Sequence, residues 1–314
     1  MTPKIVFMGT PDFAAPSLEA LIENAYEVAA VYTQPDREAG RGRHLVASPV
    51  KQVAASRGLQ VLQPESLKKP GAVEVLTSLA PGLIVVVAYG QILPPDVLAV
   101  PGFGCINVHP SLLPKYRGSS PVASVILHGD DATGVTIMLL DAGMDSGPIL
   151  SQKQLSVSPE DTTGSLTAKL AQIGADLLVE TLPLWVEGKI KPQPQDASQA
   201  TYTKVITKED GEMDWKIPAL ELWRRVRAYD PWPGCHTLWK GKRLKISQVV
   251  HMEGSKSGEV GKVVTLTQGA PAGVGVQTGD GVLGLFRVQL EGKREMSAQE
   301  FIIGHRDFIG SLLF

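Results

Sequence analysis

The 314-residue sequence is poor in cysteine: it contains only Cys105 and Cys235. Two cysteines cannot form a disulfide-rich scaffold and cannot supply a four-cysteine zinc site. The sequence also lacks an apolar run close to the ~20 residues that a membrane helix needs, and its first residues lack the apolar core of a signal peptide. We therefore expect a cytoplasmic protein with reduced thiols, no metal site and no membrane association.

Neither sign of charge dominates, since the formal net charge is −2. With 43% hydrophobic and 20% charged residues, the composition is that of a globular protein and excludes disorder and collagen-like repeats. Residues 1–205 carry 15 Lys/Arg against 19 Asp/Glu, whereas residues 206–314 carry 15 against 13. The mildly basic second part suits a module that binds a polyanion, although random surface variation explains so small a difference equally well.

Short apolar runs alternate with helical periodicities in the first part of the chain. A strand, a helix and a second strand follow one another at its start, which predicts a parallel sheet and an α/β fold. We expect strands at 4–8, 27–33, 61–62, 83–88, 105–109 and 136–140, and helices at 13–23, 50–57, 73–79, 123–128 and 165–187.

The character of the chain changes after residue 188. Residues 188–199 are polar and contain two prolines, which is typical of an extended linker. Glycine-separated short strands follow a helix at 220–229 and indicate a small β-barrel; we expect them at 244–250, 258–265, 273–277 and 282–288. The predicted organisation is a catalytic domain at 1–189, a linker at 190–206 and a smaller barrel domain at 207–314.

The most informative motif is Asn107-x-His109, followed by Pro-Ser-Leu-Leu-Pro at 110–114. Residues two apart on a strand point to the same face, and ligands of parallel sheets bind at the carboxyl ends of strands. An amide and an imidazole on one face can both donate to one oxygen, as a developing oxyanion requires. A lone histidine is more often structural, but its pairing with Asn107 favours a catalytic role.

A second polar segment, residues 141–147, follows the expected strand at 136–140. It contains two aspartates and two glycines in seven residues, which indicates a tight loop. A carboxylate beside a histidine fixes its tautomer and favours the imidazolium form. We therefore expect Asn107, His109 and Asp145, from two adjacent strand ends, to form one site.

The Asn-x-His…Asp pattern with Ser-Leu-Leu-Pro resembles that of formyltransferases that use 10-formyltetrahydrofolate. Further segments are similar, in the same order, to the methionyl-tRNA formyltransferases and extend over nearly the whole chain. They lie at 6–14, 34–42, 86–94, 104–109, 230–234, 279–281 and 296–300. One departure is Ser119-Ser120, where alanine is commoner in the family; it leaves the three catalytic positions unchanged.

This resemblance implies a Rossmann-like formyltransferase domain followed by an OB-like barrel. It implies transfer of the formyl group of 10-formyltetrahydrofolate to the α-amine of initiator methionyl-tRNA, for translation initiation, with no metal and no obligate protein partner. Asn107 and His109 would stabilise the oxyanion, and Asp145 would orient and charge His109. Folate would contact Ala88, Tyr89, Gly90, Gln91, Ile92, Leu93 and Asp141, with Ser111, Leu112, Leu113 and Pro114 closing its site. The arginines of the basic loop, Arg37, Arg41 and Arg43, would contact tRNA.

Other classes of protein fit less well. Glycinamide ribonucleotide formyltransferases share the motif but are single domains. UDP-amino-sugar formyltransferases carry a similar second module but need no basic loop at 36–44. A dinucleotide-binding oxidoreductase would require Gly-x-Gly-x-x-Gly after the first strand, where the chain reads Gly-Thr-Pro-Asp-Phe-Ala. A pure RNA-binding protein would leave the Asn/His/Asp pattern unexplained.

Overall fold

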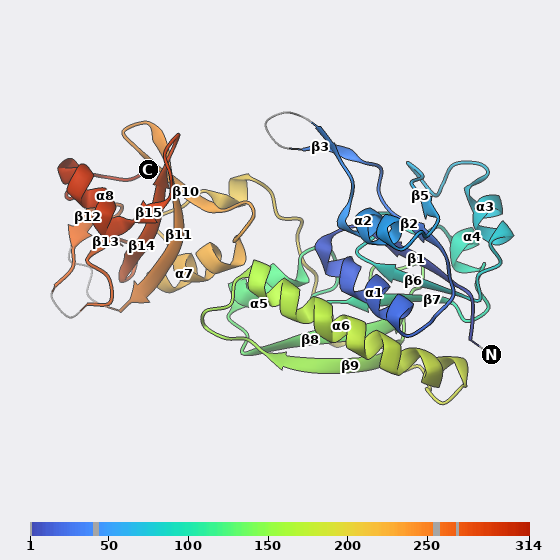
Figure 1. The fold of residues 1–314 in the computed structure, drawn as a ribbon. Coiled ribbons are helices and arrows are strands. Elements are labelled where there is room, and N and C mark those ends of the chain that lie inside the picture. Colours follow the sequence, from blue (N-terminus) through green and yellow to red (C-terminus); the bar gives the residue numbers. More distant parts are fainter. Residues whose placement is uncertain (1, 40–43, 254–257, 268–269) are drawn as a thin grey trace. The chain divides into compact units, whose positions relative to one another are not determined.

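The computed structural model describes residues 2–39, 44–253, 258–267 and 270–314. The chain divides into two compact units (Figure 1). The first unit consists of Met1–Pro121, Ala132–Ser156 and Thr167–Thr203. The second consists of Val122–Asp131, Val157–Leu166 and Lys204–Phe314. No helix among the described residues is long and apolar enough to cross a membrane.

The elements of the two units follow one another along the chain, and two helices are shared between the units. Helix α5 (Pro121–His128) lies mostly in the second unit, and α6 (Thr163–Val186) lies mostly in the first. The other elements of the first unit are β1 (Ile5–Gly9), η1 (Asp12–Ala14), α1 (Ala15–Glu23), β2 (Val28–Tyr32), β3 (Arg37–Ala39), β4 (His44–Val46), α2 (Pro49–Ser56), β5 (Val61–Leu62), α3 (Ala72–Ser78), β6 (Leu83–Val87), α4 (Pro95–Leu98), β7 (Cys105–His109), β8 (Ala132–Leu139), β9 (Ile149–Ser156) and η2 (Ala197–Gln199). Those of the second are η3 (Glu209–Gly211), α7 (Ala219–Ala228), β10 (Cys235–Trp239), β11 (Lys242–Met252), β12 (Val263–Thr265), β13 (Val274–Gln277), β14 (Val282–Leu290), β15 (Met296–Ser297), α8 (Ala298–Gly304) and η4 (Arg306–Phe308).

A seven-stranded sheet with the order β5-β2-β1-β6-β7-β8-β9 forms the centre of the first unit. The strands from β5 to β7 are parallel, whereas β8 is antiparallel to both β7 and β9. The chain moves outward from β1 to β2 and β5 and then crosses back to β6. The strand order therefore reverses between β1 and β6, where ligands of such sheets bind beyond the carboxyl ends. The predicted α/β domain with a mostly parallel sheet is confirmed.

Helices cover both faces of this sheet, which explains why β1, β6 and β7 are buried along their length and why β1 and β6 are apolar throughout. Helices α3 and α4 cover one face of the sheet, and α1 and α6 lie along the strands on the other face (Figure 1). Helix α6 comes close to β7 at Gly174, where a β-carbon would lie 2.8 Å from Cγ1 of Val108. The core on the α3 and α4 side consists of Val6, Met8, Ala30, Tyr32, Leu67, Leu76, Ile84, Val86, Tyr89, Leu93, Val97 and Cys105.

The second unit contains an antiparallel sheet with the order β10-β11-β14-β13-β12, in which β15 also pairs with β14. The C-terminal segment joins the two ends of this sheet. Its residues Gly310 and Leu313 donate backbone hydrogen bonds to carbonyls at 263 and 261, and Phe314 exchanges two with Leu238 of β10. These bonds bring the outer strands together, as the expected small barrel requires.

Several features of the chain differ from the expectations from sequence. No strand was expected where β9, β10, β15 and the β3–β4 hairpin lie, and no helix where α4 and α8 lie. The two units are not continuous in sequence: residues 190–203, expected as a linker, belong to the first unit, whereas Val122–Asp131 and Val157–Leu166 belong to the second. Residues 193–203, which we call the strap, hydrogen-bond to β9 and to the loop after β7.

Candidate active site

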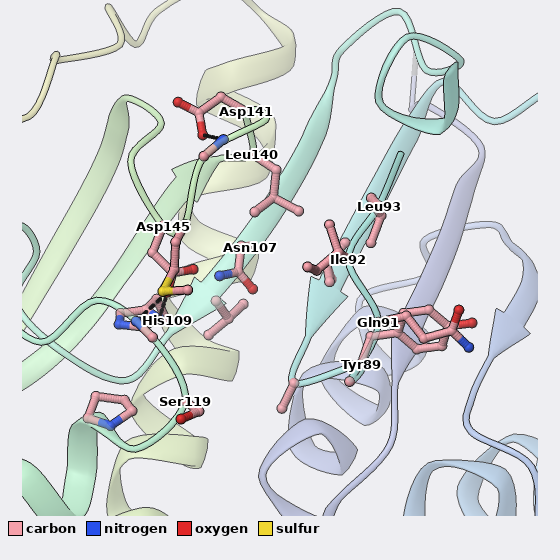
Figure 2. A pocket seen from close by; sticks show the side chains of 18 of the residues that line it. Tyr89, Gln91, Ile92, Leu93, Asn107, His109, Ser119, Leu140, Asp141 and Asp145 are labelled. Carbon is pink, nitrogen blue, oxygen red and sulfur yellow. Dashed lines mark hydrogen bonds and ion pairs between the residues drawn. The ribbon is translucent and has the colours of Figure 1, made fainter. Parts of the chain in front are cut away.

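A cavity of about 660 Å³ opens beyond the carboxyl ends of β6 and β7 (Figure 2). Such volumes are typical of small-molecule sites, which are mostly apolar with a few placed polar groups. The loop after β6, the end of β7 and the turn after β8 supply its walls. The lining residues are Phe13, Val86, Ala88, Tyr89, Gly90, Gln91, Ile92, Leu93, Leu98, Asn107, Val108, His109, Pro110, Gly118, Ser119, Pro121, Leu140, Asp141, Ala142, Gly143, Met144 and Asp145.

Asn107 lies on the cavity side of β7, and its amide points into the cavity (Figure 2). Its backbone is held on both sides, opposite Val86 of β6 and Met138 of β8. Among the residues that the structure describes, none forms a hydrogen bond with the Asn107 side chain, although that side chain belongs to a largely buried residue. An unpartnered amide at the wall of a cavity is free to donate to a ligand oxygen.

His109 ends β7 and is 4% exposed. Its Nε2 lies 3.0 Å from the carbonyl oxygen of Tyr116. Because a carbonyl only accepts, Nε2 carries the proton and Nδ1 is the basic nitrogen of the neutral ring. Burial lowers the pKa of His109 below its ordinary value, while the Asp145 carboxylate and the Tyr116 carbonyl oppose that shift. The neutral ring therefore predominates at neutral pH in the free protein.

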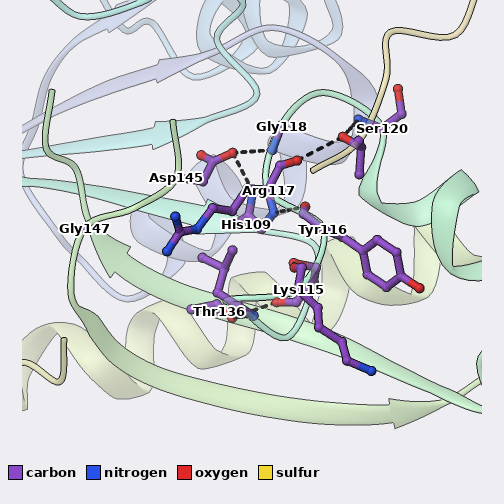
Figure 3. A network of polar contacts seen from close by, with 12 residues as sticks. His109, Lys115, Tyr116, Arg117, Gly118, Ser120, Thr136, Asp145 and Gly147 are labelled. Carbon is purple, nitrogen blue, oxygen red and sulfur yellow. Dashed lines mark hydrogen bonds and ion pairs between the residues drawn. The ribbon is translucent and has the colours of Figure 1, made fainter. Parts of the chain in front are cut away.

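Asp145 lies in the turn between β8 and β9, with a left-handed φ of 49°. Its Oδ2 accepts a hydrogen bond of 2.7 Å from the Gly118 amide and lies 3.7 Å from Nδ1 of His109 (Figure 3). Gly118 has a φ of 106°, and a β-carbon there would lie 2.9 Å from Oγ1 of Thr203, so this position requires glycine. The structure thus brings Asn107, His109 and Asp145 to one cavity wall.

The relative direction of β7 and β8 differs from what the sequence led us to expect. Asp145 was expected at a strand end adjacent to that of β7, but β8 runs antiparallel and its last residue, Leu139, lies opposite Ile106. The polypeptide leaves β8 near the start of β7, and the turn brings Asp145 back toward His109. The connection between β7 and β8, residues 110–131, is long enough to permit either strand direction, so the motif alone could not decide it.

Asp141 shapes this turn. Its Oδ1 accepts hydrogen bonds from the Gly143 amide at 3.0 Å and from Oγ of Ser146 at 2.9 Å. It is exposed and lines the cavity. Its interactions are local to the turn, which separates its role from that of Asp145.

The six expected folate contacts after β6, at 88–93, all line the cavity. Ile92 is 77% exposed there. The Tyr89 ring is buried, and burial raises the pKa of its phenol well above the usual range. Gln91 uses its amide to hold the preceding loop, since Oε1 accepts from the Leu67 amide at 3.0 Å and Nε2 donates to the Pro64 carbonyl at 3.0 Å. The loop therefore offers mainly apolar side chains and backbone to a ligand.

The Ser-Leu-Leu-Pro segment at 111–114, unlike the loop at 88–93, lies outside the cavity lining. None of Ser111, Leu112, Leu113 and Pro114 is among the described residues that line the cavity. The Ser111 hydroxyl donates to the Lys115 carbonyl at 2.6 Å, and Oγ1 of Thr136 on β8 donates to the Ser111 carbonyl and accepts from the Leu113 amide. These contacts bind the segment to the sheet, so it supports the loop that carries Tyr116 and Gly118.

The strap contributes residues that sequence reasoning missed. Gln195 donates from Nε2 to the carbonyls of Asp145 and Gly147, at 2.8 and 2.7 Å. Its Oε1 accepts from Nε and Nη2 of Arg117, at 3.1 and 2.8 Å. A polar, proline-containing segment indicates a linker, and nothing in its local pattern marks Gln195 as part of a site.

The structure describes one of the three expected tRNA-binding arginines. Arg37 is exposed on β3, and its Nη2 lies 3.4 Å from Oε1 of Gln34. Arg41 and Arg43 lie outside the described residues. Within the described part of the chain, no group of three or more His, Cys, Asp or Glu side chains is arranged to hold a metal ion.

Comparison with known proteins decides the family. A formyl transferase family model matches residues 3–182, and a model for the formyl transferase C-terminal domain matches residues 205–306. A methionyl-tRNA formyltransferase of Roseiflexus sp. (strain RS-1) is 52% identical over 96% of this chain and 93% of its own length. That of Myxococcus xanthus is 46% identical over 99% and 98%. The chain belongs to the methionyl-tRNA formyltransferase family. Its two domains are those of the family, in the same order.

Two solved structures share this fold. HypX from Aquifex aeolicus, in complex with tetrahydrofolic acid, is 18% identical with a TM-score of 0.63; the match covers 96% of this chain and 47% of HypX. An N-formyltransferase from Helicobacter canadensis, in complex with folinic acid and dTDP-3-aminofucose, is 17% identical with a TM-score of 0.63, over 93% and 99%. At this identity the likeness establishes the fold alone.

Proposed function

We propose that the protein transfers the formyl group of 10-formyltetrahydrofolate to the α-amine of initiator methionyl-tRNA in the cytoplasm. The observation that carries this proposal is the free Asn107 amide beside the His109–Asp145 pair, on the wall of a cavity with the volume of a small-molecule site. The names of the curated relatives, at 44–52% identity over nearly the full chain, support the choice of acceptor.

The reaction forms one carbon–nitrogen bond and breaks another. The neutral α-amine attacks the formyl carbon, and the carbonyl oxygen becomes an oxyanion in a tetrahedral intermediate. The bond from this carbon to N10 of the folate then breaks, so the amine loses one proton and N10 gains one. Free α-amines have a pKa near 7.7–8.0, so a neutral fraction is present at physiological pH.

Asn107 and His109 act on different parts of this intermediate. The Asn107 amide donates to the oxyanion, which stabilises charge that develops only in the transition state. His109 takes up a proton at Nδ1, because Nε2 is engaged by the Tyr116 carbonyl. Asp145 Oδ2, at 3.7 Å, stabilises the resulting imidazolium but is too distant for a direct hydrogen bond. Nδ1 is therefore free to pass a proton between amine and leaving nitrogen.

Different residues serve the two substrates in this proposal. The apolar loop at 88–93 and the turn at 141–145 form the folate site, and the folate supplies the transferable formyl group. Arg37, Arg41 and Arg43 of the basic loop contact tRNA phosphates, and the mildly basic segment 206–314 provides further phosphate contacts.

Transfer of a labelled formyl group to two acceptors tests this function. Purified protein is incubated with 10-formyltetrahydrofolate and either charged initiator tRNA or a nucleotide-linked amino sugar, the class of acceptor bound by the Helicobacter canadensis enzyme. We expect label only in the methionyl-tRNA. Label in the amino sugar alone would overturn the proposed acceptor, and label in neither would overturn the activity.

A further inference from the structure

Gln195 connects the strap to the turn that carries the catalytic carboxylate. Its side-chain nitrogen donates to two backbone carbonyls of this turn, those of Asp145 and Gly147, at 2.8 and 2.7 Å. These two carbonyls flank the backbone of Ser146. A single amide thus holds both ends of a short segment, and it fixes the backbone from which the Asp145 side chain projects toward His109.

Arg117 fixes the orientation of the Gln195 amide. The arginine is 5% exposed, and two of its guanidinium nitrogens donate to Oε1 of Gln195. A third, Nη1, lies 3.3 Å from the Tyr202 hydroxyl, and the Tyr202 ring lies beside the guanidinium carbon at 5.9 Å. Within the described chain no carboxylate pairs with Arg117. A guanidinium has only donors, so it forces the oxygen of Gln195 toward itself and the nitrogen toward the turn.

The same network reaches the other side of the histidine. The backbone of Arg117 bonds to Thr201 and Thr203 of the strap, and its neighbour Gly118 donates to Oδ2 of Asp145 (Figure 3). Tyr116, whose carbonyl accepts from His109, donates its amide to Oγ1 of Thr201 at 2.8 Å. Both groups that face the imidazole nitrogens are therefore held by strap residues.

This position requires an acceptor that faces Arg117 and a donor that faces the carbonyls of the turn, and the amide of Gln195 supplies both. Glutamate would accept from Arg117, but its carboxylate could not donate to the two carbonyls of the turn. A lysine would donate to the carbonyls but would oppose the arginine. A buried donor or acceptor without a partner costs about 1–3 kcal/mol, so each replacement leaves one side of the network unsatisfied.

We propose that Gln195, oriented by Arg117, is a positioning residue that holds the Asp145 turn in the conformation facing His109. This inference rests on the proposed function and deepens it, because it assigns a catalytic requirement to a segment that otherwise only joins two domains. Gln195 itself does not line the cavity among the described residues, so it acts through Asp145.

The first test measures His109 in the free protein and needs no substrate. The imidazole signals are titrated by NMR in the wild type, Gln195→Ala and Gln193→Ala, with a His109→Gln variant to assign the signal. The Asp145 carboxylate raises the pKa of His109, so its displacement in Gln195→Ala lowers that pKa further. Gln193 is exposed on the same strap and serves as the matched control. Equal titration in wild type and Gln195→Ala would overturn the proposal.

The second test separates positioning from folding. In Gln195→Ala we expect kcat to fall on the order of 10- to 100-fold, with the KM for folate unchanged, since small misplacements of catalytic groups have effects of this size. Gln195→Glu keeps the Arg117 contact, so the protein still folds, but it lacks the two donors; the same fall in kcat is expected, with a melting temperature lowered by only a few degrees. Wild-type kcat in Gln195→Glu would overturn the proposal even if Gln195→Ala fails to fold. An inactive wild type would instead contradict the proposed function, while the titration would still report on Gln195.

Discussion

Oδ2 of Asp145 lies 3.7 Å from Nδ1 of His109, although the strands that lead to the two residues run in opposite directions. His109 is the last residue of β7, whereas the chain leaves β8 at Leu139, opposite Ile106. The carboxylate reaches the histidine only because the turn folds back along the strand. The geometry of the His109–Asp145 pair thus depends on this turn and on the residues that hydrogen-bond to it.

The first prediction concerns the free amide at the cavity wall. Asn107→Ala should lower kcat by on the order of 10²–10³, because one donor to the oxyanion is lost, and should leave the dissociation constant for folate nearly unchanged. Single-turnover formylation and a folate titration measure the two quantities. Asn24, an exposed residue at the end of α1, offers a control in Asn24→Ala. Near-normal turnover of Asn107→Ala at saturating substrates would remove Asn107 from the mechanism.

The second prediction compares the two carboxylates of the turn. Asp145→Asn should severely reduce turnover, because an amide cannot stabilise the imidazolium as a carboxylate does. Asp141→Asn should be milder, since an amide oxygen can still accept from Gly143 and Ser146. Turnover of both variants is measured at equal enzyme concentration. The reverse order of effects would assign the catalytic role to Asp141.

The third prediction concerns stability and pH. Burial lowers the pKa of His109 in the folded protein, so below the ordinary value near 6.5 the unfolded chain binds a proton that the folded chain resists. Acid therefore destabilises the fold through this residue, and the stability is recovered as the pH rises above that value. In His109→Gln the free energy of unfolding should fall less between pH 7 and pH 5 than in the wild type.

Urea denaturation at several pH values measures this difference. His44, which is exposed on β4, provides the matched control in His44→Gln, because its ring meets water in both states. A wild-type pH dependence that His109→Gln leaves intact would show that His109 is not the group responsible. The carboxylates elsewhere in the chain titrate in all three proteins and cancel in the comparison.

Much of the parallel core could be predicted from sequence because its strands are continuous apolar runs. The run at 83–88 and the strand at 105–109 lie where they were expected. Strand β9 could not be found in this way, because it is an edge strand whose side chains are mostly exposed and polar, as in Ser-Gln-Lys-Gln at 151–154. The β3–β4 hairpin has three residues in each strand, too few to show an alternation.

In the site, too, local sequence patterns could be interpreted, whereas contacts between distant parts of the sequence could not. Asn107 and His109 share a face because residues two apart on a strand always do, so their spacing sufficed. Gln195 reaches Asp145 across 50 positions of sequence through a segment without regular structure. Contacts of that kind depend on the folded path of the strap, which neither periodicity nor composition encodes.

The last prediction concerns the basic loop and tRNA. Arg37 is exposed at the start of β3, and a guanidinium binds phosphate with a planar fork that lysine cannot copy. Arg37→Ala should therefore raise the KM for tRNA and leave folate binding intact, with partial recovery in Arg37→Lys. Arg41→Ala should act in the same way.

The salt dependence of tRNA affinity distinguishes the loss of a phosphate contact from a general loss of tRNA binding. Each lost contact should make the plot of log affinity for tRNA against log salt shallower by about 0.7–0.9, because fewer counterions are released on binding. Formylation is measured against tRNA concentration at several salt concentrations, with Arg57→Ala as the control, since Arg57 is exposed at the end of α2 and outside the loop. If the slopes of Arg37→Ala and Arg41→Ala equal that of Arg57→Ala, the loop does not bind phosphate. The reason to prefer a tRNA acceptor over an amino sugar would then rest on the mildly basic segment 206–314 and on the curated relatives.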